Sequence, residues 1–143
     1  MTKTYSIILA DPAWPYNSRC QHSKTRFGGG VSSHYPTMPV EDICRIPVRY
    51  LAAKDSALCL WTTGPHMGSG IQVLEAWGFR YVTIGWVWVK TTKAGRPWTG
   101  PGYYTKSNAE YLLLGVNGRM PPADRAVPQI IQAGIDRSRR VLA

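Results

Sequence analysis

An acid, a proline and a tryptophan stand close together near the start of the chain, in the segment Asp11-Pro12-Ala13-Trp14. The carboxylate of Asp11 and the backbone carbonyl of Pro12 are neighbouring hydrogen-bond acceptors. An aromatic amine, such as the exocyclic amino group of adenine, is a poor nucleophile because its lone pair is delocalised into the ring. If each acceptor binds one N–H, the nitrogen becomes pyramidal and its lone pair can point at an electrophilic methyl group. The segment therefore predicts methyl transfer from a sulfonium to an exocyclic amine, achieved mainly by positioning.

The aromatic ring of Trp14 has two interpretations. It can stack on a base, which is worth about 1–3 kcal/mol per base and suits an enzyme that holds a base outside the duplex. Alternatively, the segment is an ordinary turn after a strand, in which the acid caps, the proline stiffens and the tryptophan packs on the core. The four residues alone leave both interpretations open.

Strands that alternate with helices must position this segment. The apolar run 5–10 ends directly at Asp11, which predicts a buried strand with chemistry at its carboxyl end. Later apolar runs predict strands over 57–62, 79–90, 109–116 and 127–132, of which 79–90 is one strand or a bent pair. Helices are predicted over 39–46 and along the apolar stripe from Ile71 to Trp77, ended by Gly78. This alternation predicts an α/β sandwich with a mixed sheet.

Two segments outside the predicted elements have compositions that suggest function. Residues 15–38 lack any periodicity and predict a long loop, which we interpret as functional. The loop that contains Trp98, Tyr103 and Tyr104 also carries Lys and Arg, a composition that suits stacking on single-stranded nucleic acid. By contrast, Trp77, Trp86 and Trp88 lie in apolar runs and are predicted to be core residues.

Composition narrows the class of protein. The chain has 143 residues, which predicts a single domain over 1–143. Its 17 Lys and Arg against 8 Asp and Glu give a net charge of +9, and this excess favours a polyanionic partner because neutralised phosphates release counterions; solubility is the alternative explanation. No apolar run approaches the roughly 20 residues of a membrane span, so we expect a cytoplasmic protein without a membrane partner. The three cysteines and three histidines lack ligand spacing, and we expect no metal.

Several segments between Tyr5 and about Arg140 match the sequence pattern of one known family in the same order, and this match explains the features described above. The chain resembles the adenine methyltransferases related to the mRNA adenine methyltransferase catalytic subunit, together with their bacterial and phage DNA-modifying relatives. Besides Asp11 to Trp14, the matching segments are His34-Tyr-Pro-Thr-Met38, Leu58-Cys-Leu-Trp-Thr62, Glu75-Ala-Trp-Gly-Phe79, Trp88-Val-Lys-Thr91, Asn108-Ala-Glu110 and Leu113-Leu-Gly-Val-Asn-Gly118.

The resemblance implies a fold, a reaction and a set of site residues. The fold would be a Rossmann-like α/β sandwich with a mixed, incomplete sheet. The reaction would transfer a methyl group from S-adenosylmethionine to the 6-amino group of adenine in nucleic acid, with DNA favoured over RNA. The implied catalytic residues are Asp11, Pro12 and Trp14. The implied substrate-binding residues are Ala13, Tyr16, Tyr35, Lys90, Asn108 and Glu110. Asp11 and Ala10 would contact the cofactor.

Two departures from the family pattern limit what the resemblance implies. Ala13 replaces a second proline, which removes one fixed φ angle but leaves the Pro12 carbonyl available. The family also continues past the position of Arg140 with cofactor-binding elements, so we expect this chain to lack those contacts. Two alternatives therefore stay open. One is an inactive nucleic-acid-binding or partner subunit, as a homodimer or heterodimer; the other is a truncated prophage remnant.

Overall fold

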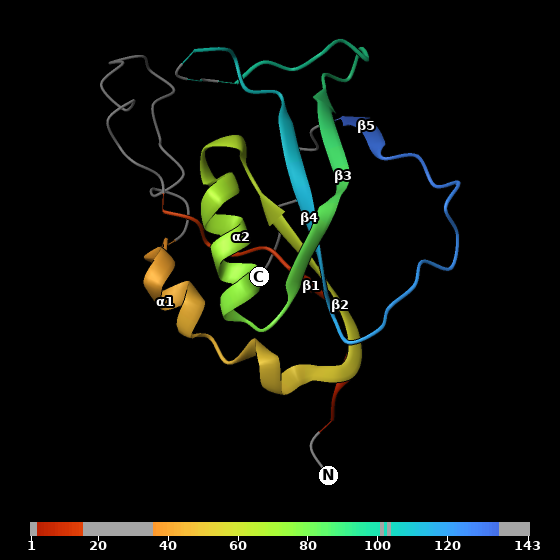
Figure 1. Ribbon diagram of the computed structural model, residues 1–143. Helices are drawn as coiled ribbons and strands as arrows, with labels where there is room; N and C mark the ends of the chain where they lie inside the picture. Colours follow the sequence, from red (N-terminus) through yellow and green to blue (C-terminus); the bar gives the residue numbers. More distant parts are fainter. Residues whose placement is uncertain (1–2, 16–35, 101, 103, 135–143) are drawn as a thin grey trace.

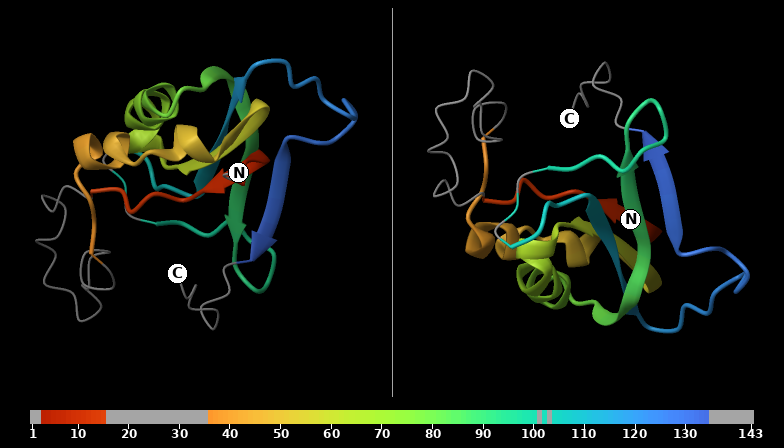
Figure 2. Two further views of the ribbon diagram at one scale, coloured as in Figure 1. Left: turned by 90° about the horizontal axis from the view of Figure 1, so that it is seen from below. Right: turned by 90° about the horizontal axis from the view of Figure 1, so that it is seen from above.

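A mixed sheet with α-helices on one of its sides forms the framework of the chain (Figures 1 and 2). The computed structural model describes residues 3–15, 36–100, 102 and 104–134. The strands are β1 (Tyr5–Ala10), β2 (Ala52–Thr62), β3 (Arg80–Thr91), β4 (Ala109–Asn117) and β5 (Ile130–Gly134). The α-helices are α1 (Val40–Arg45) and α2 (Met67–Ala76), and the short 3-10 helices are η3 (Val48–Leu51) and η4 (Gly64–His66).

The order of the strands brings several strand ends to one edge of the sheet. That order is β1-β2-β4-β3-β5. β1 runs parallel to β2, and β5 runs parallel to β3, whereas β4 is antiparallel to both of its neighbours. The carboxyl ends of β1, β2, β3 and β5 therefore meet the start of β4 at the same edge, which we call the carboxyl edge. Polar residues that follow these strands are thus brought close together.

The core lies between the sheet and the two α-helices. Leu58, Leu60 and Leu113 of the sheet and Val73 and Leu74 of α2 are fully buried. Apolar burial of this kind stabilises the domain by about 25 cal/mol per Å². On the side of β1 away from the helices, Ile7 and Leu9 are 65% and 68% exposed, respectively.

Glycine lets α2 approach the sheet closely. A Cβ atom on Gly115 of β4 would lie 2.6 Å from Leu74 Cδ2, and one on Gly70 of α2 would lie 2.9 Å from Leu113 Cδ1. At the end of α2, the indole N–H of Trp77 donates to the Ile43 carbonyl of α1 at 2.9 Å. These contacts fix the helices against the sheet.

The predicted Rossmann-like α/β fold with a mixed, incomplete sheet is confirmed, with changes in its details. β2 begins at Ala52, earlier than the predicted residue 57, and β3 is one strand rather than a bent pair. β5 begins at Ile130 instead of residue 127; Pro128 has no N–H for a ladder bond, so pairing starts after it. Of the predicted core tryptophans, Trp77 is buried, but Trp86 and Trp88 are only partly buried. No helix among the described residues is long and apolar enough to cross a membrane.

Candidate active site at the carboxyl edge

A small polar cleft opens where β1, β2 and β4 meet at the carboxyl edge. Its lining combines two acidic residues with aromatic and hydroxyl side chains: Asp11, Pro12, Trp14, Trp61, Thr62, Thr63 and Glu110. The cleft has a volume of about 90 Å³, below the roughly 300 Å³ at the small end of ligand sites. The described residues therefore accommodate only part of a large ligand.

The two acceptors predicted from the sequence lie at this cleft. Asp11 directly follows β1, and the Pro12 carbonyl accepts a hydrogen bond from the backbone N–H of Trp14 at 2.9 Å. A carbonyl oxygen has two lone pairs, so this bond leaves one acceptor position on Pro12. The Ala13 carbonyl accepts a bond from the N–H of Met38 at 2.9 Å, which connects the segment to the residues before α1.

Trp14 is a buried residue, 4% exposed, although it lines the cleft. Its indole N–H donates to the Trp61 carbonyl at 3.0 Å. Its ring stacks on His66, with centroids 5.5 Å apart and planes inclined by 16°. The structure thus shows the core packing that one interpretation of the sequence predicted, whereas stacking of Trp14 on a base stays a prediction.

Asp11 has a perturbed carboxyl group. Asp11 is exposed as a residue, but the walls of the cleft remove part of the water around its carboxyl. This burial raises the pKa of Asp11, and the negative charge of Glu110 raises it further. A carboxylate with a raised pKa is a stronger proton acceptor, which is what a general base requires.

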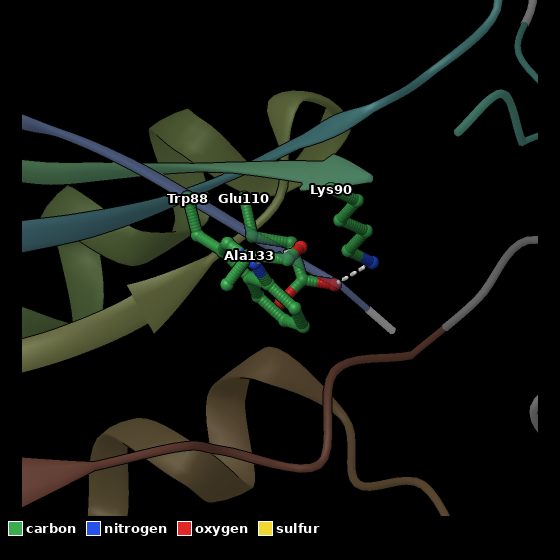
Figure 3. Close-up of polar contacts among 4 residues, drawn as sticks. All are labelled: Trp88, Lys90, Glu110 and Ala133. Carbon is green, nitrogen blue, oxygen red and sulfur yellow. Dashed lines mark hydrogen bonds and ion pairs between the residues drawn. The ribbon is translucent and has the colours of Figure 1, made fainter. Parts of the chain in front are cut away.

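Glu110 forms an ion pair with Lys90 across β3 and β4 (Figure 3). The Lys90 ammonium also lies over the rings of Trp88 and Trp98, 5.2 Å and 5.7 Å from their centroids. The Trp88 indole N–H donates to the Ala133 carbonyl of β5 at 3.2 Å. Lys90 is therefore held by a carboxylate and two aromatic faces beside the cleft, and it balances the charge of Glu110.

The other site residues implied by the sequence have varied positions. Ala10 ends β1 and packs against the core. The Asn108 carbonyl accepts a bond from the N–H of Lys90 at 2.8 Å, so Asn108 lies at the same edge. Tyr16 and Tyr35 lie outside the described residues. The structure thus brings Asp11, Pro12, Ala13, Trp14, Lys90, Asn108, Glu110 and Ala10 to the carboxyl edge.

The end of β2 supplies Trp61, Thr62 and Thr63 to the cleft, although no functional role was predicted for it. The hydroxyl of Thr63 is buried without a hydrogen-bond partner in the described structure. The sequence contained a signal for such a role. Parallel strands end at the same edge of a sheet, and the strand predicted over 57–62 is the next strand along the chain after the Asp11 segment.

A basic turn follows β3 at the carboxyl edge. The N–H of Thr92 donates to the Arg96 carbonyl at 2.8 Å, and the N–H of Arg96 donates to Thr92 Oγ1 at 3.2 Å. Gly95 completes the turn with a φ of +74°, which suits glycine. The turn exposes Lys93 and Arg96. Two basic side chains from one turn thus lie at the carboxyl edge.

The lining of the cleft is acidic. Asp11 and Glu110 place two carboxylates at one cleft, which suits a positive charge. Within the described ranges, no group of three or more His, Cys, Asp and Glu side chains is placed to hold a metal.

The sequence of the chain is similar to those of known methyltransferases. A sequence model of the family described as MT-A70 matches residues 5–139. The chain is 33% identical over 144 residues to the Type II methyltransferase M.MunI of Mycoplasma sp, covering 91% of this chain and 59% of that protein. It is 28% identical over 126 residues to an Arabidopsis thaliana N(6)-adenosine-methyltransferase MT-A70-like protein, covering 87% and 16% of the two chains. For the Homo sapiens N(6)-adenosine-methyltransferase catalytic subunit METTL3 the identity is 28% over 134 residues, covering 92% and 19%. The chain therefore spans less than two thirds of each of these relatives.

Proposed function

The chain belongs to the MT-A70 family, and from that premise we propose that it transfers a methyl group from S-adenosylmethionine to the 6-amino group of adenine in nucleic acid. The observation that carries this proposal is the acceptor pair at the end of β1. Asp11 lines the cleft with a raised pKa, and the Pro12 carbonyl keeps one acceptor position. Each acceptor would bind one N–H of the amine, which directs the nitrogen lone pair away from the ring.

The proposed roles follow from what each residue contacts. Asp11 and Pro12 orient the amine, and Asp11 accepts the proton that the nitrogen loses once it is methylated. Lys90 offsets the negative charge of Glu110, so that the Asp11 carboxyl can stay ionised and accept a proton. Asn108 and Ala13 help to shape the substrate side through their backbone bonds. Base contacts by Trp14, Tyr16 and Tyr35 remain part of the proposal.

The cofactor is proposed from the charge of the cleft. When bound, S-adenosylmethionine supplies an electrophilic methyl group on a sulfonium cation. The carboxylate of Asp11 fits that cation, and Ala10 is the neighbouring backbone at the end of β1. With a volume of about 90 Å³, the cleft fits the reacting end of the cofactor rather than a whole ligand, which needs roughly 300 Å³ or more.

DNA is the polymer that we propose. The identity of 33% to a Type II methyltransferase exceeds the 28–30% to enzymes named for adenosine, which is a ribonucleoside. The net charge of +9 and the basic turn at Lys93 and Arg96 support a nucleic-acid substrate of either kind.

An inactive binding subunit is the second candidate. The small volume of the cleft favours it. Such a subunit would bind nucleic acid in a salt-dependent way but would transfer no methyl group.

The test is methyl transfer by the purified chain from labelled S-adenosylmethionine to adenine-containing DNA and RNA oligonucleotides. We expect incorporation into adenine, and we expect Asp11→Ala to reduce it by about 100-fold or more, as does removal of other preorganised polar groups. The matched control is Asp42→Ala, because Asp42 is an acid paired with Arg45 on the surface of α1; this variant should keep its activity. A folded wild-type chain that binds DNA without transferring methyl would favour the second candidate.

A further inference from the structure

His66 contacts the segment that follows β1, although it comes from another part of the chain. Its ring stacks on Trp14 at 5.5 Å between centroids, and a hydrogen bond joins it to the backbone of Pro15. Since proline has no N–H, the Pro15 carbonyl must accept and a ring N–H of His66 must donate. His66 therefore contacts the segment at two points directly after Asp11 and Pro12.

The backbone of His66 is itself fixed at the end of β2. Its carbonyl accepts a bond from the Thr62 hydroxyl at 3.0 Å. Its N–H donates to the Thr63 carbonyl at 3.0 Å, which closes the turn of η4. Thr62 is buried, with 2% exposure. The imidazole thus connects a rigid strand of the core to the loop that carries the acceptors.

Trp14 transmits this restraint to Pro12. The indole is held on one side by the Trp61 carbonyl and stacks on His66, both from the region at the end of β2. The backbone N–H of Trp14 donates to the Pro12 carbonyl at 2.9 Å, so a shift of Trp14 would turn that carbonyl. Burial lowers the pKa of His66, which favours the neutral ring.

We propose that His66 is a positioning residue for the methyl-transfer reaction: it holds Trp14 and Pro15, and through them the acceptor pair of Asp11 and Pro12. The catalytic consequence rests on the proposed function. The structural restraint does not depend on that function, because His66 makes these contacts in the chain without substrate. One measurement therefore tests the restraint, and a second tests its effect on catalysis.

The first measurement is hydrogen exchange by NMR at the indole N–H of Trp14 and the amide of Met38, in the absence of ligands. His66→Ala removes both contacts and should accelerate exchange at these groups roughly tenfold or more. His66→Phe keeps a stacking ring and should give a smaller increase. Tyr50→Ala removes a 68% exposed ring and is the matched control, for which no change is expected at either group.

Two outcomes of this measurement would overturn the restraint. One is unchanged exchange in His66→Ala. The other is equal acceleration at strand amides such as Leu113, which would mean that His66 affects only the global stability of the chain. His66→Phe decides the matter if His66→Ala does not fold.

The second measurement is steady-state methyl transfer. His66→Ala should lower kcat by about 100-fold, since small misplacements of reacting groups have effects of that size, while KM for the oligonucleotide stays close to the wild-type value. Recovery of part of kcat in His66→Phe would support positioning, and a rise in KM with unchanged kcat would overturn it. If the wild-type chain transfers no methyl, the proposed function fails, whereas the exchange rates still decide whether His66 holds the segment.

Discussion

Like charges at Asp11 and Glu110 make the protonation of Asp11 depend on its neighbour. Burial is the larger cause of the raised pKa of Asp11, and the charge of Glu110 is the second. Lys90 offsets part of that charge through its ion pair with Glu110. The proton affinity of Asp11 is therefore set by a group on β4 as well as by the walls of the cleft.

Glu110→Gln should lower the pKa of Asp11. Loss of the nearby negative charge favours the ionised carboxyl, so Asp11 should titrate at lower pH than in the wild type. Carbon-13 NMR of the Asp11 carboxyl, recorded over a pH series, measures this directly. Glu75→Gln, an exposed acid on α2, should leave the titration unchanged. An unchanged or higher pKa of Asp11 in Glu110→Gln would contradict this account of the cleft.

At the residue scale, the sequence predicted the acceptor pair but not its supports. Asp11 and Pro12 follow an apolar run directly, so their place at a strand end is a local property. The direction of the Trp14 ring depends on His66 and Trp61, which are distant in sequence. No local pattern distinguishes a buried indole from one that stacks on a base, and this is why both interpretations stayed open.

At the element scale, the sequence predicted the existence of the strands better than their ends. Alternating and continuous apolar residues revealed all five strands because one face of each strand needs burial. The start of β2 was missed, since Lys54 and Asp55 interrupt the apolar pattern; Ala52 pairs with Tyr5, and pairing resumes at Ser56 and Ala57 after an irregularity. The order β1-β2-β4-β3-β5 depends on contacts between distant segments, and local periodicity carries no information on it.

The packing of α2 on β4 should be sensitive to a single methyl group. In Gly115→Ala the new Cβ would come within 2.6 Å of Leu74, whose side chain is fully buried. We expect a loss of about 1–3 kcal/mol in the free energy of unfolding, as for other overpacked cores. Chemical denaturation measures this loss.

Gly85→Ala on β3 provides the matched control for that prediction. The nearest atoms to its new Cβ would lie at 3.5 Å, which is an ordinary contact. Its stability should stay near that of the wild type. Equal losses in both variants would show that replacing a strand glycine, rather than contact with Leu74, determines the result.

At the scale of the whole molecule, the excess of positive charge has a location that composition does not reveal. The net charge of +9 predicts a polyanionic partner but not a face. The fold places Lys93 and Arg96 on the turn after β3, at the same edge as Asp11. Arg80 begins β3 and Arg119 follows β4, so both lie at the opposite edge. A nucleic acid bound for methylation should therefore contact the first pair and not the second.

The double variant Lys93→Ala/Arg96→Ala should weaken DNA binding and reduce its dependence on salt. Each lost phosphate contact lowers the slope of log Kobs against log salt by about 0.9 for duplex and about 0.7 for single strands. Two lost contacts thus predict a reduction of roughly 1.8 with a duplex probe and roughly 1.4 with a single-stranded probe. Fluorescence anisotropy over a salt series supplies both slopes.

The control variant Arg80→Ala/Arg119→Ala removes the same charge from the opposite edge, so its slope should match that of the wild type. Equal reductions of the slope in both double variants would mean that net charge, and not the carboxyl edge, governs binding.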